Sequence, residues 1–171
     1  MSMRFFVLSL VFVLASIGVS RASPLQQAID KAPSGAVIAL GPGFYEGNIA
    51  ISKPLTLRAS GKGVVIHGDG TGSVITVTAS YVTVDGLTIE NSGPKHQTVD
   101  AGITVRGADN VKILRNRIRD CLFGVNFEQT NRSVIEDNDI TSLPVSLGLK
   151  GDGIRLWYSH GNLIRMNRTR Y

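Results

Sequence analysis

One pattern is repeated in three stretches: Gly102–Asn116 (GITVRGADNVKILRN), Gly124–Asn138 (GVNFEQTNRSVIEDN) and Gly153–Asn167 (GIRLWYSHGNLIRMN). Each copy begins with Gly, continues with alternating apolar residues, and places an Asn three residues after an Ile. The first two copies are 22 residues apart and the last two are 29 apart, so seven residues are inserted between Ile140 and Gly153. The repeat is short, and its apolar residues alternate as in a strand rather than recurring with the period of a helix. This pattern predicts a solenoid of short strands.

A single coil cannot bury its apolar side chains, but stacked coils can, because equivalent strands then lie about 4.8 Å apart. Aligning the copies gives inward-facing columns on three faces. These are Ile75, Ile103, Val125, Ile154 with Val77, Val105, Phe127, Leu156 on the first face; Val84, Ile113, Ile135, Ile164 on the second; and Ile89, Ile118, Ile140 and, weakly, Thr169 on the third. Three faces per turn predict an all-β fold, a right-handed single-stranded parallel β-helix of the pectin lyase type.

Three asparagines, Asn116, Asn138 and Asn167, fall at the corner between the second and third faces. A sharp bend there leaves backbone groups without ladder partners, and Asn tolerates the left-handed conformation and can bond the backbone or a stacked neighbour. We therefore expect a structural ladder of asparagines rather than catalytic residues.

The N-terminal segment, residues 1–22, has the features of a secretory signal peptide. An early Arg4 precedes an apolar stretch, Phe5–Val19, and small residues follow. This stretch of 15 residues falls short of the about 20 needed to span a bilayer. Export, cleavage and a periplasmic location are predicted, with no membrane span afterwards. Loss of Arg4 and Arg21 lowers the net charge from +5 to +3. A net charge this weakly positive indicates no nucleic-acid partner.

Residues 23–171 are expected to form one β-helix domain. Its start, Pro24–Ala32, places Leu25, Ala28, Ile29 and Ala32 on one helical face, just before a predicted strand at Ala36–Leu40, which predicts a short helix that caps the first coil. Its other end, Arg165–Tyr171, stops partway through a coil without a capping element, so the domain is predicted to be incomplete at its C-terminus.

The outward residues of the first face form a predicted binding shelf. Two columns are expected to be exposed there, Thr104, Asn126, Arg155 and Arg106, Glu128, Trp157, with Asp152 and Tyr158 beside them. Glycosidic cleavage requires paired carboxylates or a metal-neutralised uronate. The shelf has one acid, Glu128. Asp152 lies beside it, but the equivalent positions in the two earlier coils are Ala101 and Phe123, so no stack of acids forms. This argues against hydrolysis and suits binding of an acidic sugar or a protein.

Longer insertions gather at one corner beside the shelf and predict a cleft there. They place His67 and His96 in successive coils, where two imidazoles could hold copper or zinc. The alternative is that both are solvated loop histidines.

The tripeptide Ser159-His160-Gly161 is a weak match to the His-containing tripeptide of polygalacturonases and is predicted to be a turn. Cys121 has no partner for an internal disulfide and is predicted to be a buried thiol.

Two segments, Gly151–Asn162 (GDGIRLWYSHGN) and Ala36–Glu46 (AVIALGPGFYE), together with the Asn-containing coils, resemble the NosD family of nitrous oxide reductase maturation proteins. The resemblance covers nearly all of residues 23–171, although family members are longer. It implies a periplasmic, non-enzymatic protein that acts with the ATPase and membrane subunits of an ABC transporter. It also implies a role in assembling the copper centre of nitrous oxide reductase, with copper as the bound metal. No metal ligand is carried over by motif.

Two other functions stay open from the sequence. One is a secreted carbohydrate-binding or polysaccharide-modifying β-helix protein, because the fold does not decide function. In this class a lyase or hydrolase is the enzymatic alternative, while binding of a uronate without turnover would indicate a sugar-binding module. The other is a product without independent function, whose last coil exposes an unpaired edge prone to association.

Overall fold

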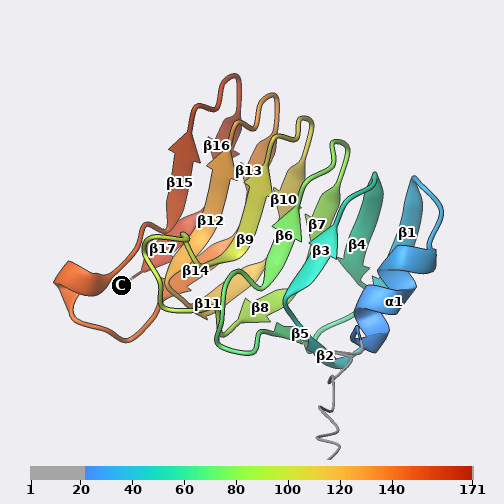
Figure 1. Cartoon of the computed structure of the whole chain (residues 1–171), viewed down its shortest axis with the longest axis horizontal. Helices are drawn as coiled ribbons and strands as arrows, with labels where there is room; N and C mark the ends of the chain where they lie inside the picture. The colour runs from blue at the N-terminus through green and yellow to red at the C-terminus, as the bar shows by residue number, and fades with distance from the viewer. Residues whose placement is uncertain (1–21, 171) are drawn as a thin grey trace, which may run out of the picture.

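The computed structural model describes residues 22–170, which form a stack of short parallel strands with an α-helix, α1 (Pro24–Lys31), against its first coil and a 3-10 helix, η1 (Leu147–Leu149), in the loop before the last coil (Figure 1). The first sheet contains β3 (Ile49–Ile51), β6 (Ile75–Val77), β9 (Ala101–Arg106), β12 (Phe123–Glu128) and β15 (Ile154–Trp157). The second contains β1 (Ala36–Leu40), β4 (Leu55–Ala59), β7 (Thr83–Asp85), β10 (Lys112–Leu114), β13 (Val134–Glu136) and β16 (Leu163–Arg165). The third contains β2 (Gly43–Glu46), β5 (Val64–His67), β8 (Thr88–Glu90), β11 (Arg117–Cys121), β14 (Asp139–Ser142) and β17 (Arg168–Arg170).

Each strand pairs in parallel with the equivalent strand of the next coil, so the predicted parallel β-helix is confirmed. The register is also the one expected from the repeats: Val125 pairs with both Ile103 and Ile154, and Ile135 pairs with both Ile113 and Ile164. The inward side chains of all three sheets form one continuous core in which Phe127 is fully buried. The core therefore runs along the axis of the stack.

The glycine that opens each repeat lies where the third sheet packs against the start of the first. A Cβ atom added to Gly102 would lie 2.5 Å from Cγ2 of Ile118, and one added to Gly153 would lie 2.7 Å from Cγ2 of Thr169. At Gly124 the added atom would meet both Cγ2 of Ile140 and the carbonyl oxygen of Gly153. The repeat thus requires Gly because the backbone approaches a third-sheet side chain too closely for any Cβ.

The three predicted corner asparagines form a hydrogen-bonded ladder. The Nδ2 atom of Asn116 donates to Oδ1 of Asn138 (3.1 Å), and Nδ2 of Asn138 donates to Oδ1 of Asn167 (2.9 Å). Each of these oxygens also accepts the backbone N–H of the asparagine one coil earlier. The expected left-handed conformation falls instead on the preceding residues, Arg115 and Asp137, with φ values of 52° and 56°. The asparagine can then turn its amide into the corner.

Helix α1 covers the first coil as expected. Ser23 begins the helix by accepting the N–H of Gln26, and Leu25 and Ile29 are buried. Ala28, predicted on the same face, is exposed. The Gln26 amide donates to the carbonyl of Ala50 in β3 and accepts its N–H, so a side chain replaces the missing neighbouring strand at this edge.

The last coil, made of β15, β16 and β17, exposes Leu156 and Ile164, whose equivalents in the preceding coil, Phe127 and Ile135, are buried. The predicted signal peptide lies outside the described residues except for Ala22, so export and the periplasmic location stay predictions. In the described part of the chain, no helix is long and apolar enough to cross a membrane.

Replacement of Gly124 by Ala is expected to lower the free energy of unfolding by about 1–3 kcal/mol, because the new methyl group overpacks the junction between β12 and Ile140. Chemical denaturation of purified protein measures the change. Gly148→Ala is the matched control, since a Cβ there meets no atom within 4 Å. Equal stability of the two variants would contradict the close-packing explanation.

Candidate binding cleft

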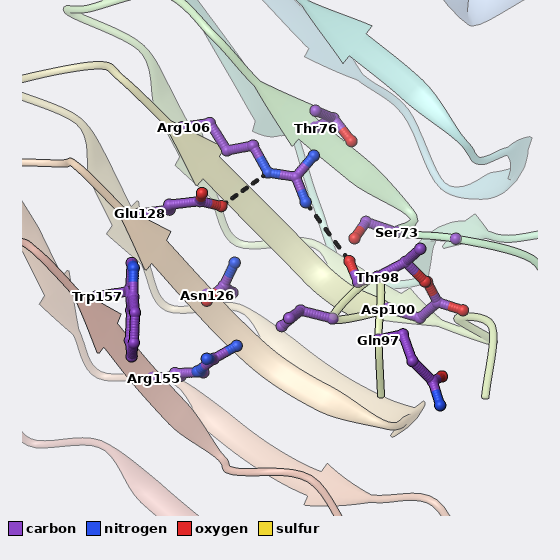
Figure 2. Close-up of a pocket in the computed structure, with 12 residues that line it drawn as sticks. Ser73, Thr76, Gln97, Thr98, Asp100, Arg106, Asn126, Glu128, Arg155 and Trp157 are labelled. Atoms are coloured by element: carbon purple, nitrogen blue, oxygen red, sulfur yellow. Dashed lines mark hydrogen bonds and ion pairs between the residues drawn. The ribbon is translucent and has the colours of Figure 1, made fainter. Parts of the chain in front are cut away.

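The outer surface of the first sheet forms one wall of an open cleft of about 660 Å³. The segment before β9 forms the facing wall (Figure 2). The lining residues are mostly polar: Gly72, Ser73, Thr76, Gln97, Thr98, Val99, Asp100, Arg106, Asn126, Glu128, Arg155 and Trp157. The sequence indicated a cleft from the insertion that ends at Asp100, but did not single out Gln97 or Thr98 within it.

Four of the six predicted shelf residues line the cleft, namely Arg106, Glu128, Arg155 and Trp157. The other two lie outside its lining: Asp152 is exposed before β15, and Tyr158 follows β15 with its ring edge-on to Trp157.

The expected exposure of Thr104 and Asn126 is wrong, because each is only 1 % exposed. Their strands pair directly, and a short side chain on stacked strands is covered by its longer neighbours. The floor of the cleft is therefore recessed rather than a flat shelf.

The charged groups of the cleft differ in whether they are already paired. The Nε atom of Arg106 donates to Oε2 of Glu128 (3.0 Å), and its Nη2 donates to the carbonyl of Thr98 (3.4 Å), which joins the two walls (Figure 2). Arg155 instead lies 5.4 Å from the centre of the Trp157 ring and 5.9 Å from that of Phe123. These cation–π contacts fix its guanidinium but use none of its N–H donors.

The facing wall is held in shape by the buried carboxylate of Asp100. Its Oδ1 accepts the hydroxyl of Thr98 (2.6 Å), and its Oδ2 accepts the backbone N–H of Lys95 (3.0 Å). Gly93 is required beside it, because a Cβ there would overlap the same carboxylate. Asp100 therefore orders the loop, and its two oxygens are already engaged.

His67 lies away from the cleft, on the outer side of the third sheet. Its Nδ1 is 2.9 Å from Oε1 of Glu90, and Nε of Arg119 donates to Oε2 of the same carboxylate (2.6 Å). Burial alone would raise the pKa of Glu90, but the hydrogen bonds from His67 and Arg119 outweigh it and hold the pKa below its ordinary value. The cluster is an ion-paired carboxylate shared by three coils.

His96 has different partners from His67: its Nε2 lies 3.0 Å from the carbonyl oxygen of Leu149, and its ring stands edge-on to Phe123. Within residues 22–170, no group of three or more His, Cys, Asp or Glu side chains is arranged to hold a metal ion. A shared site at His67 and His96 stays a prediction.

The remaining predicted sites are structural. Cys121 is buried as predicted, and burial raises the pKa of its thiol to about 12. The segment Ser159-His160-Gly161 forms the predicted turn between β15 and β16: Oγ of Ser159 accepts the N–H of Thr130, and Gly161 has a φ of 62°.

The family model described as "Right handed beta helix region" matches residues 55–170, which is most of the chain. The chain belongs to the right-handed β-helix family. The match includes both walls of the cleft and all three corner asparagines. It leaves out β1 to β3 and the capping helix.

Two curated relatives carry the name "Probable ABC transporter binding protein NosD". The protein from Pseudomonas aeruginosa is 32 % identical over 162 residues, which cover 94 % of this chain and 38 % of the relative. The one from Stutzerimonas stutzeri is 30 % identical over 133 residues, 77 % of this chain and 30 % of the relative. The resemblance to NosD is confirmed, and the chain spans about a third of the length of these relatives.

Among solved structures, an alginate lyase from Paenibacillus aligns with a TM-score of 0.65 at 20 % identity, over 85 % of this chain and 63 % of the lyase. This likeness shows a shared fold and no more.

Replacement of Glu90 by Gln is expected to lower stability by about 1.5–3 kcal/mol at pH 7, because it removes the charge bound by His67 and Arg119. The pKa of Glu90 is lowered by folding, so its stabilisation is complete above the unfolded pKa and is lost as pH falls through the lower folded pKa.

Denaturation midpoints of the two proteins should therefore converge below about pH 4. Glu46→Gln is the control, because Glu46 is exposed and pairs with His67 on the neighbouring strand. Its denaturation midpoint should differ little from that of the wild type. A difference between wild type and Glu90→Gln that persists unchanged at low pH would contradict this assignment.

Proposed function

We propose that this chain is a periplasmic accessory protein that acts with an ABC transporter in the maturation of the copper centre of nitrous oxide reductase. The observation that carries the proposal is its similarity to NosD proteins along 94 % of its length. That relative is named as a probable ABC transporter binding protein. A β-helix offers such a protein a long, rigid surface for docking.

The acids of the cleft support an accessory role rather than catalysis. A hydrolase needs two carboxyl groups free to donate or accept protons across a glycosidic bond. The lining contains only Glu128 and Asp100 as acids; Glu128 is paired with Arg106, and Asp100 holds the adjacent loop through both of its oxygens. Activity on polysaccharides is the less favoured alternative.

Copper enters this proposal as the cargo of the maturation process. Three of the candidate copper-binding groups have other surroundings: Nδ1 of His67 faces Glu90, Nε2 of His96 faces a backbone carbonyl, and the Cys121 thiol is buried. A copper site at His67 and His96 stays a prediction, and no step of the maturation is assigned to these residues.

The loop between β14 and β15 is the proposed contact with the transporter. It contains the seven-residue insertion, projects from the stack (Figure 1), and exposes Leu147 and Leu149 by 77 % and 59 %. Clustered exposed apolar side chains on a projecting element are typical of protein interaction sites.

We expect residues 1–171, expressed with their own N-terminal segment, to co-purify with the transporter subunits and with nitrous oxide reductase that lacks copper. Changing both Leu147 and Leu149 to Ser should weaken capture about tenfold, because buried apolar anchors dominate interface energy. Phe44→Ser is the matched control, since Phe44 is 80 % exposed on the third sheet. Quantitative pull-down measures the effect.

Failure of monodisperse wild-type protein to capture either partner would refute the proposed function. Equal loss of capture in the Phe44 variant and in the leucine variant would refute the assignment of the loop. Copper analysis of the captured reductase, in cells with and without the chain, tests the maturation step itself. An unchanged copper content would count against it.

A further inference from the structure

A buried amide without a partner lies in the cleft. Asn126 is 1 % exposed, lines the cleft, and makes no hydrogen bond through either Oδ1 or Nδ2 within residues 22–170. A buried polar group left without a partner costs about 1–3 kcal/mol. The buried corner amides of Asn116 and Asn138 are fully used in their ladder. The amide of Asn126 is thus available to donate to and accept from a bound molecule.

An unpaired cation lies beside this amide. Asn126 and Arg155 are paired residues on β12 and β15, so their side chains project from the same face of the sheet (Figure 2). Six other arginines bind a carboxylate of an adjacent coil, but Arg155 has no carboxylate partner in the described chain. The aromatic rings of Trp157 and Phe123 orient its guanidinium and leave its planar set of donors for an anion.

The rest of the cleft matches a hydroxyl-rich ligand. Hydroxyl side chains come from Ser73 and Thr76 at the β6 end of the sheet, and Gln97 and Thr98 add an amide and a hydroxyl from the facing wall. Trp157 is 49 % exposed and offers an apolar ring surface on which the C–H face of a pyranose can stack. The loop held by Asp100 keeps this wall preorganised, which lowers the entropic cost of binding.

The charge of the cleft distinguishes between anions. One unpaired guanidinium faces the ligand, and Glu128 and Asp100 are on the same lining. A dianionic phosphate would be repelled by these two carboxylates, whereas a single carboxylate needs only one bidentate guanidinium. The sugar hydroxyls would be bound by the amide and hydroxyl groups. A sugar that carries one carboxylate per ring fits this arrangement.

We propose that this cleft binds a uronic-acid oligosaccharide, with a sugar carboxylate on Arg155, a neighbouring hydroxyl on the Asn126 amide and a ring face on Trp157. The assignment goes beyond the proposed accessory function and does not rest on it. It describes binding without cleavage.

The single tryptophan of the chain reports on this site, because Trp157 lines the cleft. Titration of the full-length protein with oligogalacturonate should give a saturable change in tryptophan fluorescence. The methyl-esterified oligomer, which lacks the negative charge, should bind at least about tenfold more weakly. Oligomannuronate and oligoglucuronate, tested in parallel, identify which uronate fits.

Two variants test the assignment of residues. Arg155→Gln should weaken binding about tenfold to a hundredfold, because it removes a charge-assisted hydrogen bond. Asn126→Leu, close in shape, should abolish binding while the melting temperature stays equal or rises, since two orphan polar atoms are removed. Arg58→Gln, at an exposed position on the second sheet, is the control and should bind like the wild type.

The proposal is overturned if none of the three oligouronates changes the fluorescence of folded protein, if acid and ester bind equally, or if Asn126→Leu binds like the wild type. The titration contains neither transporter nor reductase, so its failure is distinguishable from failure of the accessory function. If the oligouronate binds but the transporter and the reductase are not captured, uronate binding in the cleft is supported and the accessory function is contradicted.

Discussion

The whole molecule depends on the parallel stacking of one coil on the next. Every strand pairs with its equivalent one coil away, so each inward residue lies on an inward residue of the next coil, about 4.8 Å distant. Apolar residues stack into a single core, of which the column Leu57, Val84, Ile113 and Ile135 is one part. The same constraint excludes a Cβ at Gly102, Gly124 and Gly153, because the third sheet there packs directly on the backbone of the first.

Stacking also decides where polar groups can go. At the sharp corner, the asparagine amides replace the ladder hydrogen bonds that the bend removes, and they do so from one coil to the next. On the outer faces, six arginines reach across one coil spacing to a carboxylate. Exposed pairs of this kind are individually worth about 0–1 kcal/mol, so their main effect is to neutralise charge along the stack.

The binding cleft arises where this regularity is interrupted. Arg155 stacks on an amide, Asn126, rather than on a carboxylate, and Asn126 has no polar partner in the described chain. The insertion before β9 adds a second wall, which Asp100 holds in place. The second insertion, between β14 and β15, projects from the stack with exposed leucines. The two insertions, which touch where His96 meets the carbonyl of Leu149, therefore add to one scaffold a surface suited to a small polar ligand and another suited to a protein.

The sequence by itself determined the fold, the register and the inward columns, because a repeat that must stack on itself allows only one alignment of its apolar residues. It also located the asparagine corner and four of the residues that line the cleft. It could not show that the left-handed residue precedes each asparagine, since either position would turn the chain.

Only the tertiary structure decided that Thr104 and Asn126 are buried, that Glu128 is paired with Arg106, and that His67 and His96 have different partners. These contacts join residues 22, 23 and 53 positions apart in the chain, and they depend on how a loop folds back over the sheet. The local pattern of a single coil does not contain that information.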